Sequence, residues 1–233
     1  MLKGYRLIGA NIAVFAALFA FALLFSPEII GMLKAFAPAT ITLIALSPEA
    51  GMTTMVFIAI ASALLIDMPI LVISLHLWLK SNDIYRENEI KFMHNTIFLS
   101  IFLFYIGTAF GFISYTQWGI PFFVWADSAM GIASTWGITL FTAQLLMSSV
   151  VMGVLFLVPI MLHYLIKQGF LSVETLRKQR LKVGIGIAAM IFIVPFLPSA
   201  PVQQLMVGIV LYGLYESVIW FNSRHPAPMV ATA

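Results

Sequence analysis

The sequence predicts an all-α integral membrane protein with six transmembrane helices and both termini in the cytoplasm. Three observations support this fold class: an apolar composition, six long apolar segments, and a one-sided distribution of basic residues. Of the 233 residues, 62% are hydrophobic and 9% are charged, and the mean hydropathy is +1.04. Because a soluble domain carries about 25% charged residues, lipid rather than water must surround this chain. The composition therefore excludes an ordinary soluble enzyme and a nucleic-acid-binding protein.

Six segments are long and apolar enough, or nearly so, to cross a hydrocarbon core of roughly 30 Å, which takes about 20 helical residues. These segments are residues 8–25, 52–79, 94–115, 140–166, 183–197 and 202–221. Pro69 lies inside the second segment and predicts a kink there. No internal repeat and no separate soluble domain interrupts the pattern. Residues 1–233 are therefore expected to form a single integral membrane domain.

The basic residues determine the predicted orientation, because cytoplasmic loops of membrane proteins are enriched in Lys and Arg. With both termini inside, 11 of the 12 Lys and Arg residues fall in inside segments, and Lys34 is the exception. The largest basic group contains Arg177, Lys178 and Arg180. We expect this group in a cytoplasmic loop around residues 167–182.

The two long outer loops, residues 26–51 and 116–139, are nearly neutral and rich in apolar side chains. The second loop carries Trp118, Trp125 and Trp136. Indole rings prefer the headgroup level of a bilayer, and apolar stretches of this length favour short helices that lie in the interface. We therefore expect interfacial helices in both outer loops.

Two carboxylic acids lie within predicted membrane helices, where ionisable side chains are costly and mark candidate functional sites. Asp67 lies in the middle of the second helix, and is either a structural carboxyl beside the kink at Pro69 or a functional group. Glu216, in the inner part of the sixth helix, either reaches toward headgroups and basic loops or faces inward with a functional role. Gln203 and Gln204 begin the sixth helix, where they either cap it or offer hydrogen bonds to a partner helix.

The first inside loop, residues 80–91, mixes both charges and contains three acids, Asp83, Glu87 and Glu89. Carboxylates pair bidentately with guanidinium groups, so these acids could bind a ligand that carries arginine. The alternative is a solvated loop with internal ion pairs, which contribute little energy. Composition alone favours this second interpretation.

No familiar catalytic or metal-binding constellation is present. The absence of cysteine excludes thiolate ligands, thiol nucleophiles and disulfides. Three histidines, His76, His94 and His163, fall near the inner ends of predicted helices, where they could bind haem or a metal ion. However, no paired histidines and no acidic ligand cluster accompany them. Interfacial histidines are the favoured interpretation. We expect no enzymatic activity, no metal and no cofactor.

The second half of the chain resembles the TatC family, the multi-spanning core of the twin-arginine protein translocase. The resemblance covers roughly residues 40–222 and rests on the order and spacing of several blocks. The first two blocks are the run Phe-Tyr-Ile-Gly-Thr-Ala-Phe at 104–110 and a phenylalanine followed by a proline at Phe156 and Pro159. The other three are the run Leu-Arg-Lys-Gln-Arg at 176–180, a proline-rich turn before Gln204, and the run Leu-Tyr-Glu at 214–216.

The resemblance implies a receptor and scaffold in the plasma membrane with a concave helical bundle. TatC proteins bind the twin-arginine signal peptides of folded export substrates at their cytoplasmic face, and transport uses the proton-motive force. They assemble with single-span TatA/TatB-type partners into homo- or hetero-oligomers, without nucleic acid. Glu89 matches the signal-binding glutamate of the family, with Glu87 beside it. Gln204 matches the glutamine near which a partner helix docks, and Glu216 is a second expected contact.

The sequence also departs from the family pattern. The N-terminal acidic motif is absent, Leu157 replaces an intramembrane glutamate, and Ala200 replaces an acid after the proline turn. Either another subunit supplies the missing acids or the chain is a diverged paralogue. A second hypothesis, from a different class, is a proton-linked carrier of small solutes that uses Asp67 and Glu216. The lack of repeat symmetry argues against the carrier.

Overall fold

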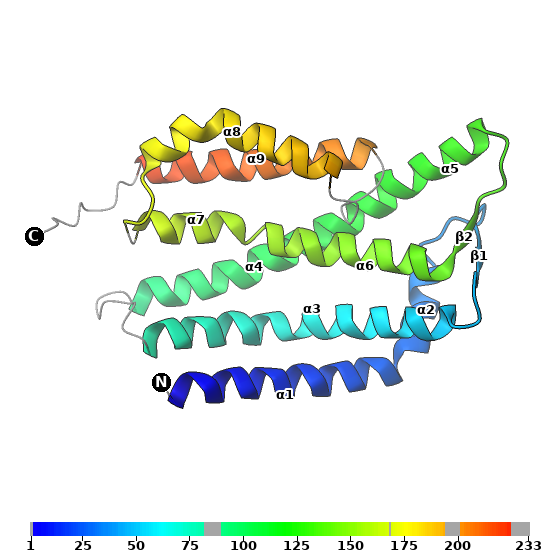
Figure 1. Cartoon of the computed structure of the whole chain (residues 1–233), viewed down its shortest axis with the longest axis horizontal. Helices are drawn as coiled ribbons and strands as arrows, with labels where there is room; N and C mark the ends of the chain where they lie inside the picture. Colours follow the sequence, from blue (N-terminus) through cyan, green and yellow to red (C-terminus); the bar gives the residue numbers. More distant parts are fainter. Residues whose placement is uncertain (1, 82–89, 168, 194–200, 225–233) are drawn as a thin grey trace, which may run out of the picture.

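A layered bundle of long helices, closed at one end by a two-stranded sheet, makes up the computed structural model of the chain (Figure 1). The structure describes residues 2–81, 90–167, 169–193 and 201–224. The long helices are α1 (Leu2–Leu24), α3 (Ala50–Ser81), α4 (Ile90–Ser114), α6 (Ile138–Leu155), α8 (Val173–Ile193) and α9 (Pro201–Arg224). The short elements are α2 (Ser26–Lys34), β1 (Thr42–Ile44), the π-helical turn η2 (Tyr115–Gly119), α5 (Ile120–Ala129), β2 (Thr135–Gly137) and α7 (Val158–Lys167).

Across the bundle, α1 packs on α3, α3 packs on α6, and α6 crosses α4 obliquely (Figure 1). α8 and α9 form a hairpin that contacts the other elements chiefly through α7 and η2. We call the left end of Figure 1 the basic end, because Lys167, Arg177, Lys178 and Arg224 lie on the helix termini there. The opposite end, which holds β1 and β2, is the strand end.

The prediction of an all-helical membrane fold is confirmed. Within the described residues, four helical stretches are long and apolar enough to cross a membrane, and α1 with α2, bent by 64°, would make a fifth. The four stretches are Ala50–Trp78, Asn95–Ala129, Ile138–Lys167 and Gln204–Arg224. The fifth predicted span, 183–197, extends into residues outside the described ranges. Six spans and cytoplasmic termini therefore stay predictions.

Two predicted boundaries are wrong. The third predicted span ended at residue 115, but its helix continues through η2 into α5 as far as Ala129. The fourth predicted span, 140–166, agrees with one candidate stretch, Ile138–Lys167, although a turn at residues 156–157 separates α6 from α7 within it. Pro159 lacks the backbone N–H that would donate to the carbonyl oxygen of Leu155, which favours a break here. The basic loop expected at 167–182 is largely helical, because α8 begins at Val173.

The first predicted outer loop contains the short helix α2, as expected, whereas in the second loop α5 continues the helical stretch of α4 and η2 and is not a separate short helix. β1 pairs in parallel with β2, so that Thr42 lies opposite Thr135 and the two loops are joined. The indole Nε1 of Trp136 donates to Oδ2 of Asp127 at 3.1 Å, which ties β2 to α5. A buried apolar cluster joins α2, α3, η2, α5 and α6 with the residue before β1, and contains Leu33, Ile41, Ile58, Tyr115, Ile120, Phe141 and Leu145. The position of these helices in a bilayer interface stays a prediction.

α4 and α6 cross so closely that glycine is required at the contact. A Cβ at Gly107 would lie 2.5 Å from the backbone oxygen of Met152, and one at Gly111 would collide with another backbone oxygen of α6. On α6, a Cβ at Gly153 would lie 2.5 Å from Oγ1 of Thr108. Small residues four apart let two helix backbones approach closely in a bilayer. This crossing sets the oblique course of α4 in Figure 1.

Candidate functional site

An apolar groove runs between α8 and α9 in the half of the hairpin nearer the strand end. Small residues contribute to both of its walls, Gly184 and Ala188 on α8 and Gly208 on α9. Larger apolar side chains complete the lining: Ile187, Leu205, Ile209 and Tyr212. Because the small residues leave the backbones accessible, a further helix could approach both walls closely. The groove therefore has the chemistry of a docking site for a membrane helix.

Two polar contacts join α8 to α9 in the other half of the hairpin, toward the basic end. Nη2 of Arg180 donates to Oε2 of Glu216 at 2.7 Å, and both side chains are partly exposed. The hydroxyl of Tyr215 donates to the backbone oxygen of Leu176, also at 2.7 Å, inside a buried cluster. These contacts hold the hairpin closed at the basic end.

A third polar contact joins the hairpin to α7. Nδ1 of His163 and Oδ1 of Asn222 lie 2.8 Å apart, and Nδ2 of Asn222 donates to the backbone oxygen of Val218. Since an amide oxygen can only accept, the Nδ1 of His163 carries the proton in this pair. The histidine that was interpreted as interfacial thus has a definite structural partner on α9.

The predicted partner contacts lie at different places on α9. Gln204 is half-buried in the first turn, next to Leu205, which lines the groove. Glu216 lies three turns further along and is paired with Arg180. The role of both residues in binding a partner helix stays a prediction.

The residues predicted to bind a signal peptide, Glu87 and Glu89, lie outside the described residues. The helices on either side are described: α3 ends and α4 begins at the basic end. The predicted basic loop is corrected, because Arg177, Lys178 and Arg180 are exposed on the first turns of α8 rather than on a loop.

Asp67 is the most buried acid among the described residues, with 1% of its surface exposed. Its Oδ1 has no hydrogen-bond partner among the described residues. Two helical turns further along α3, on the same face, Ser74 donates to Oδ1 of Asn11 at 3.0 Å and so connects α3 to α1. Pro69 lies within α3, which continues through it to Ser81.

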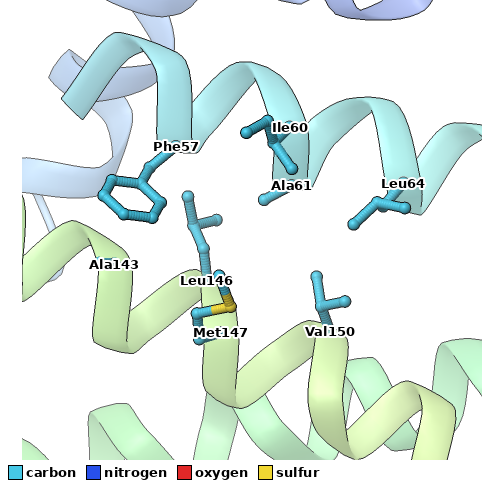
Figure 2. Close-up of a pocket in the computed structure, with 8 residues that line it drawn as sticks. All are labelled: Phe57, Ile60, Ala61, Leu64, Ala143, Leu146, Met147 and Val150. Atoms are coloured by element: carbon cyan, nitrogen blue, oxygen red, sulfur yellow. The ribbon is translucent and has the colours of Figure 1, made fainter. Parts of the chain in front are cut away.

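A small cavity between α3 and α6 has a volume of about 20 Å³. Figure 2 shows its lining: Phe57, Ile60, Ala61 and Leu64 from α3, and Ala143, Leu146, Met147 and Val150 from α6. This volume would admit one water molecule, but a buried water needs two to four polar partners and every lining side chain is apolar. The cavity is therefore a packing gap and not a solute pathway.

The groove and several polar pairs were not predicted from the sequence. Tyr115 donates to Oε1 of Gln144 at 2.9 Å between η2 and α6, and Asn222 was not considered at all. One signal for the groove is visible in the sequence, the small residues four apart at Gly184 and Ala188. In the part of the chain that the structure describes, no group of three or more His, Asp or Glu side chains is placed to hold a metal ion.

Comparisons with known proteins agree with the resemblance noted in the sequence. Residues 4–209 match the family model of the Sec-independent protein translocase protein TatC. The chain is 29% identical over 175 residues to the Sec-independent protein translocase protein TatC of Desulforapulum autotrophicum. That match covers 72% of this chain and 60% of the relative, so the chain spans about three fifths of the relative's length.

Two crystal structures of the twin-arginine translocase receptor TatC share the fold. One has a TM-score of 0.73 and covers 96% of this chain and 98% of the other. The second, of the receptor in DDM, has a TM-score of 0.75 and covers 94% and 98% of the two chains. Both are 21% identical to this chain, so they establish the fold alone. With the family model matched over residues 4–209, the chain belongs to the TatC family of membrane proteins.

Proposed function

We propose that this chain is a receptor and scaffold subunit of a twin-arginine translocase that exports folded proteins across the plasma membrane. The observation that carries the proposal is the open apolar groove of α8 and α9 on a TatC fold. The chain catalyses no reaction and binds two kinds of peptide segment, a twin-arginine signal peptide and the membrane helix of a TatA/TatB-type partner. Transport by the homo- or hetero-oligomer uses the proton-motive force.

Signal-peptide recognition is assigned to Glu89, with Glu87 beside it, in the segment between α3 and α4. A guanidinium group presents two parallel N–H donors to a carboxylate, whereas an ammonium group acts as a point charge. Carboxylates at this position therefore favour an arginine pair over a lysine pair. The family match and the corresponding glutamate in the family pattern support this assignment.

A photocrosslinker at residue 89 tests the assignment. We expect a crosslink to a twin-arginine precursor that is lost when both arginines are replaced by lysines. Glu89→Ala should abolish export while the protein remains inserted in the membrane. The control is Glu49→Ala, which removes an exposed acid beside the start of α3 at the strand end and should leave export unchanged. A crosslink that is indifferent to the lysine replacement would contradict the assignment.

Partner docking is assigned to the groove, with Gln204 at its outer edge. Leucine at Gly184 would fill the groove, whereas Gly186 does not line the groove and a Cβ there would meet nothing within 4 Å. We expect a photocrosslinker at Leu205 to capture a TatA/TatB-type partner in the Gly186→Leu variant and not in the Gly184→Leu variant. Equal crosslinking in the two variants would exclude the groove as the docking site.

The carrier hypothesis is not favoured. A proton-linked carrier needs its acids on one connected pathway, but Glu216 is paired with Arg180 near the basic end and Asp67 lies on α3. α3 packs against α1, α4 and α6 rather than against α9. The carrier hypothesis would be supported if liposomes that contain this chain alone showed solute flux and if Asp67→Asn abolished that flux.

A further inference from the structure

The first turns of α8 carry three exposed cations, Arg177, Lys178 and Lys182, that have no ion pair among the described residues. A fourth cation in the same stretch, Arg180, is held by Glu216 on α9. The acid on these turns is Glu174, so the exposed surface has an excess of positive charge. This positive charge calls for an anionic ligand.

The three cations share one face of α8 with exposed apolar side chains. At 100° per residue, an arc of about 140° holds the three cations together with Leu181 and Ile185. The exposed acid Glu174 lies in the same arc, one turn before Arg177 and Lys178, so the net charge of the arc is +2. Leu181 is 76% exposed and Ile185 is 60% exposed. The opposite face of α8, by contrast, packs on α9 through a buried cluster that includes Leu176. The face that α9 leaves uncovered therefore combines an excess of cations with exposed apolar side chains.

The dimensions of this face match the headgroup layer of a bilayer. From Arg177 to Lys182 the helix rises about 7.5 Å, and the polar layer of one leaflet is about 5–8 Å thick. At the same end of the bundle, Trp220 is 56% exposed and Arg224 lies 4.1 Å above its ring. An exposed indole with a basic neighbour is typical of headgroup depth.

We propose that this face of α8 binds an anionic phospholipid, with the lipid phosphate at Arg177, Lys178 and Lys182 and the acyl chains along Leu181 and Ile185. A soluble phosphate or an acidic peptide would leave the apolar side chains uncovered, whereas a lipid covers both. The same cations repel a twin-arginine signal, so this face is separate from the proposed signal site. The lipid braces the hairpin whose other half carries the groove.

The test uses the full chain in nanodiscs with a fluorophore at Ala189→Cys, which lies on the same face one turn beyond Ile185. The label is specific because the chain contains no cysteine. We expect brominated phosphatidylglycerol to quench the label at a lower mole fraction than brominated phosphatidylcholine. Each Gln replacement at Arg177, Lys178 and Lys182 should reduce this preference about fivefold, the ratio equivalent to about 1 kcal/mol per cation.

Two controls separate charge from folding. Lys178→Arg with Lys182→Arg retains the charge and should retain the preference. Arg180→Gln with Glu216→Gln removes a cation that is already paired and should leave the preference unchanged. Equal quenching by the two lipids, or a preference that survives all three Gln replacements, would overturn the proposal. Loss of the preference in inorganic phosphate, but not in chloride of equal ionic strength, would identify a free-phosphate site and overturn the lipid assignment.

Discussion

The close contact between α4 and α6 at Gly107 provides a direct test of how the bundle is held together. The perturbation is Gly107→Ala, which adds one methyl group. The new Cβ would lie 2.5 Å from the backbone oxygen of Met152 and 2.7 Å from Cγ of Phe156. The oxygen belongs to the helix backbone and the ring is buried, so neither can rotate away. The two helices must move apart or bend.

The size of the effect follows from the geometry. Ordinary contact begins near 3.4 Å, so the backbones must separate by roughly 0.9 Å. Overpacking of this kind costs about 1–3 kcal/mol. Replacing glycine by alanine also favours a helix by up to about 1 kcal/mol, which would obscure the clash. Gly186→Ala on α8 gains the same propensity, and its Cβ meets nothing within 4 Å. The difference between the two variants therefore isolates the clash.

Unfolding by SDS in mixed micelles, followed by tryptophan fluorescence, measures this difference. We expect Gly107→Ala to be less stable than Gly186→Ala by about 1–3 kcal/mol. A result in which the two variants unfold at the same SDS fraction would show that the helices separate without cost. The close crossing would then not determine the course of α4.

Three other predictions use the polar contacts. Tyr115→Phe removes the hydrogen bond to Gln144 and should lower the free energy of unfolding by about 0.6–1.7 kcal/mol in the same titration; an unchanged midpoint would show that the bond contributes nothing. Arg180→Glu should destabilise the hairpin, and adding Glu216→Arg should restore its stability, because the ion pair is then re-formed with the charges exchanged. The coupling energy between the two changes should be about 0.2–1 kcal/mol because the pair is partly exposed. Failure of the second change to compensate would exclude direct pairing. Trp136→Phe removes the bond to α5 and should speed amide exchange in β1 and β2, which unaltered exchange would contradict.

The apolar helices could be predicted because hydropathy in a membrane protein reports directly on what crosses the bilayer. The second predicted span, 52–79, lies within α3, and the fourth, 140–166, lies within α6 and α7 together. The short helix α2 of the first outer loop was also predictable, because an apolar stretch in a membrane protein needs an internally satisfied backbone. In each case the signal is local.

The start of α8 was mispredicted because the criterion of apolar length rejects cations. Arg and Lys are nevertheless good helix formers. The helix is also capped locally: the backbone N–H of Thr175 donates to Oγ of Ser172 at 3.1 Å. A capping residue before a basic run was thus a better guide to the helix boundary than hydropathy.

The polar pairs could not be predicted, because each joins residues that are distant in the sequence. Tyr115 and Gln144 are 29 positions apart, and His163 and Asn222 are 59 apart. Their spacing follows from how the helices cross, which is set by glycine contacts and turn lengths rather than by hydropathy. The groove could not be predicted for the same reason, since Gly184 on α8 lines a groove only because α9 places Gly208 nearby.

The division of the hairpin into two halves bears directly on how a partner helix could bind. The polar contacts described for it, at Glu216, Tyr215 and Asn222, lie in the half toward the basic end, where the bond of Tyr215 is buried and the Arg180–Glu216 pair is partly exposed. The half toward the strand end is lined by small and apolar residues and depends on van der Waals packing. A helix that enters the groove would therefore add packing without breaking a hydrogen bond of the hairpin. Under the proposed scaffold function, this separation would let a partner bind and leave while the hairpin stays anchored to α7.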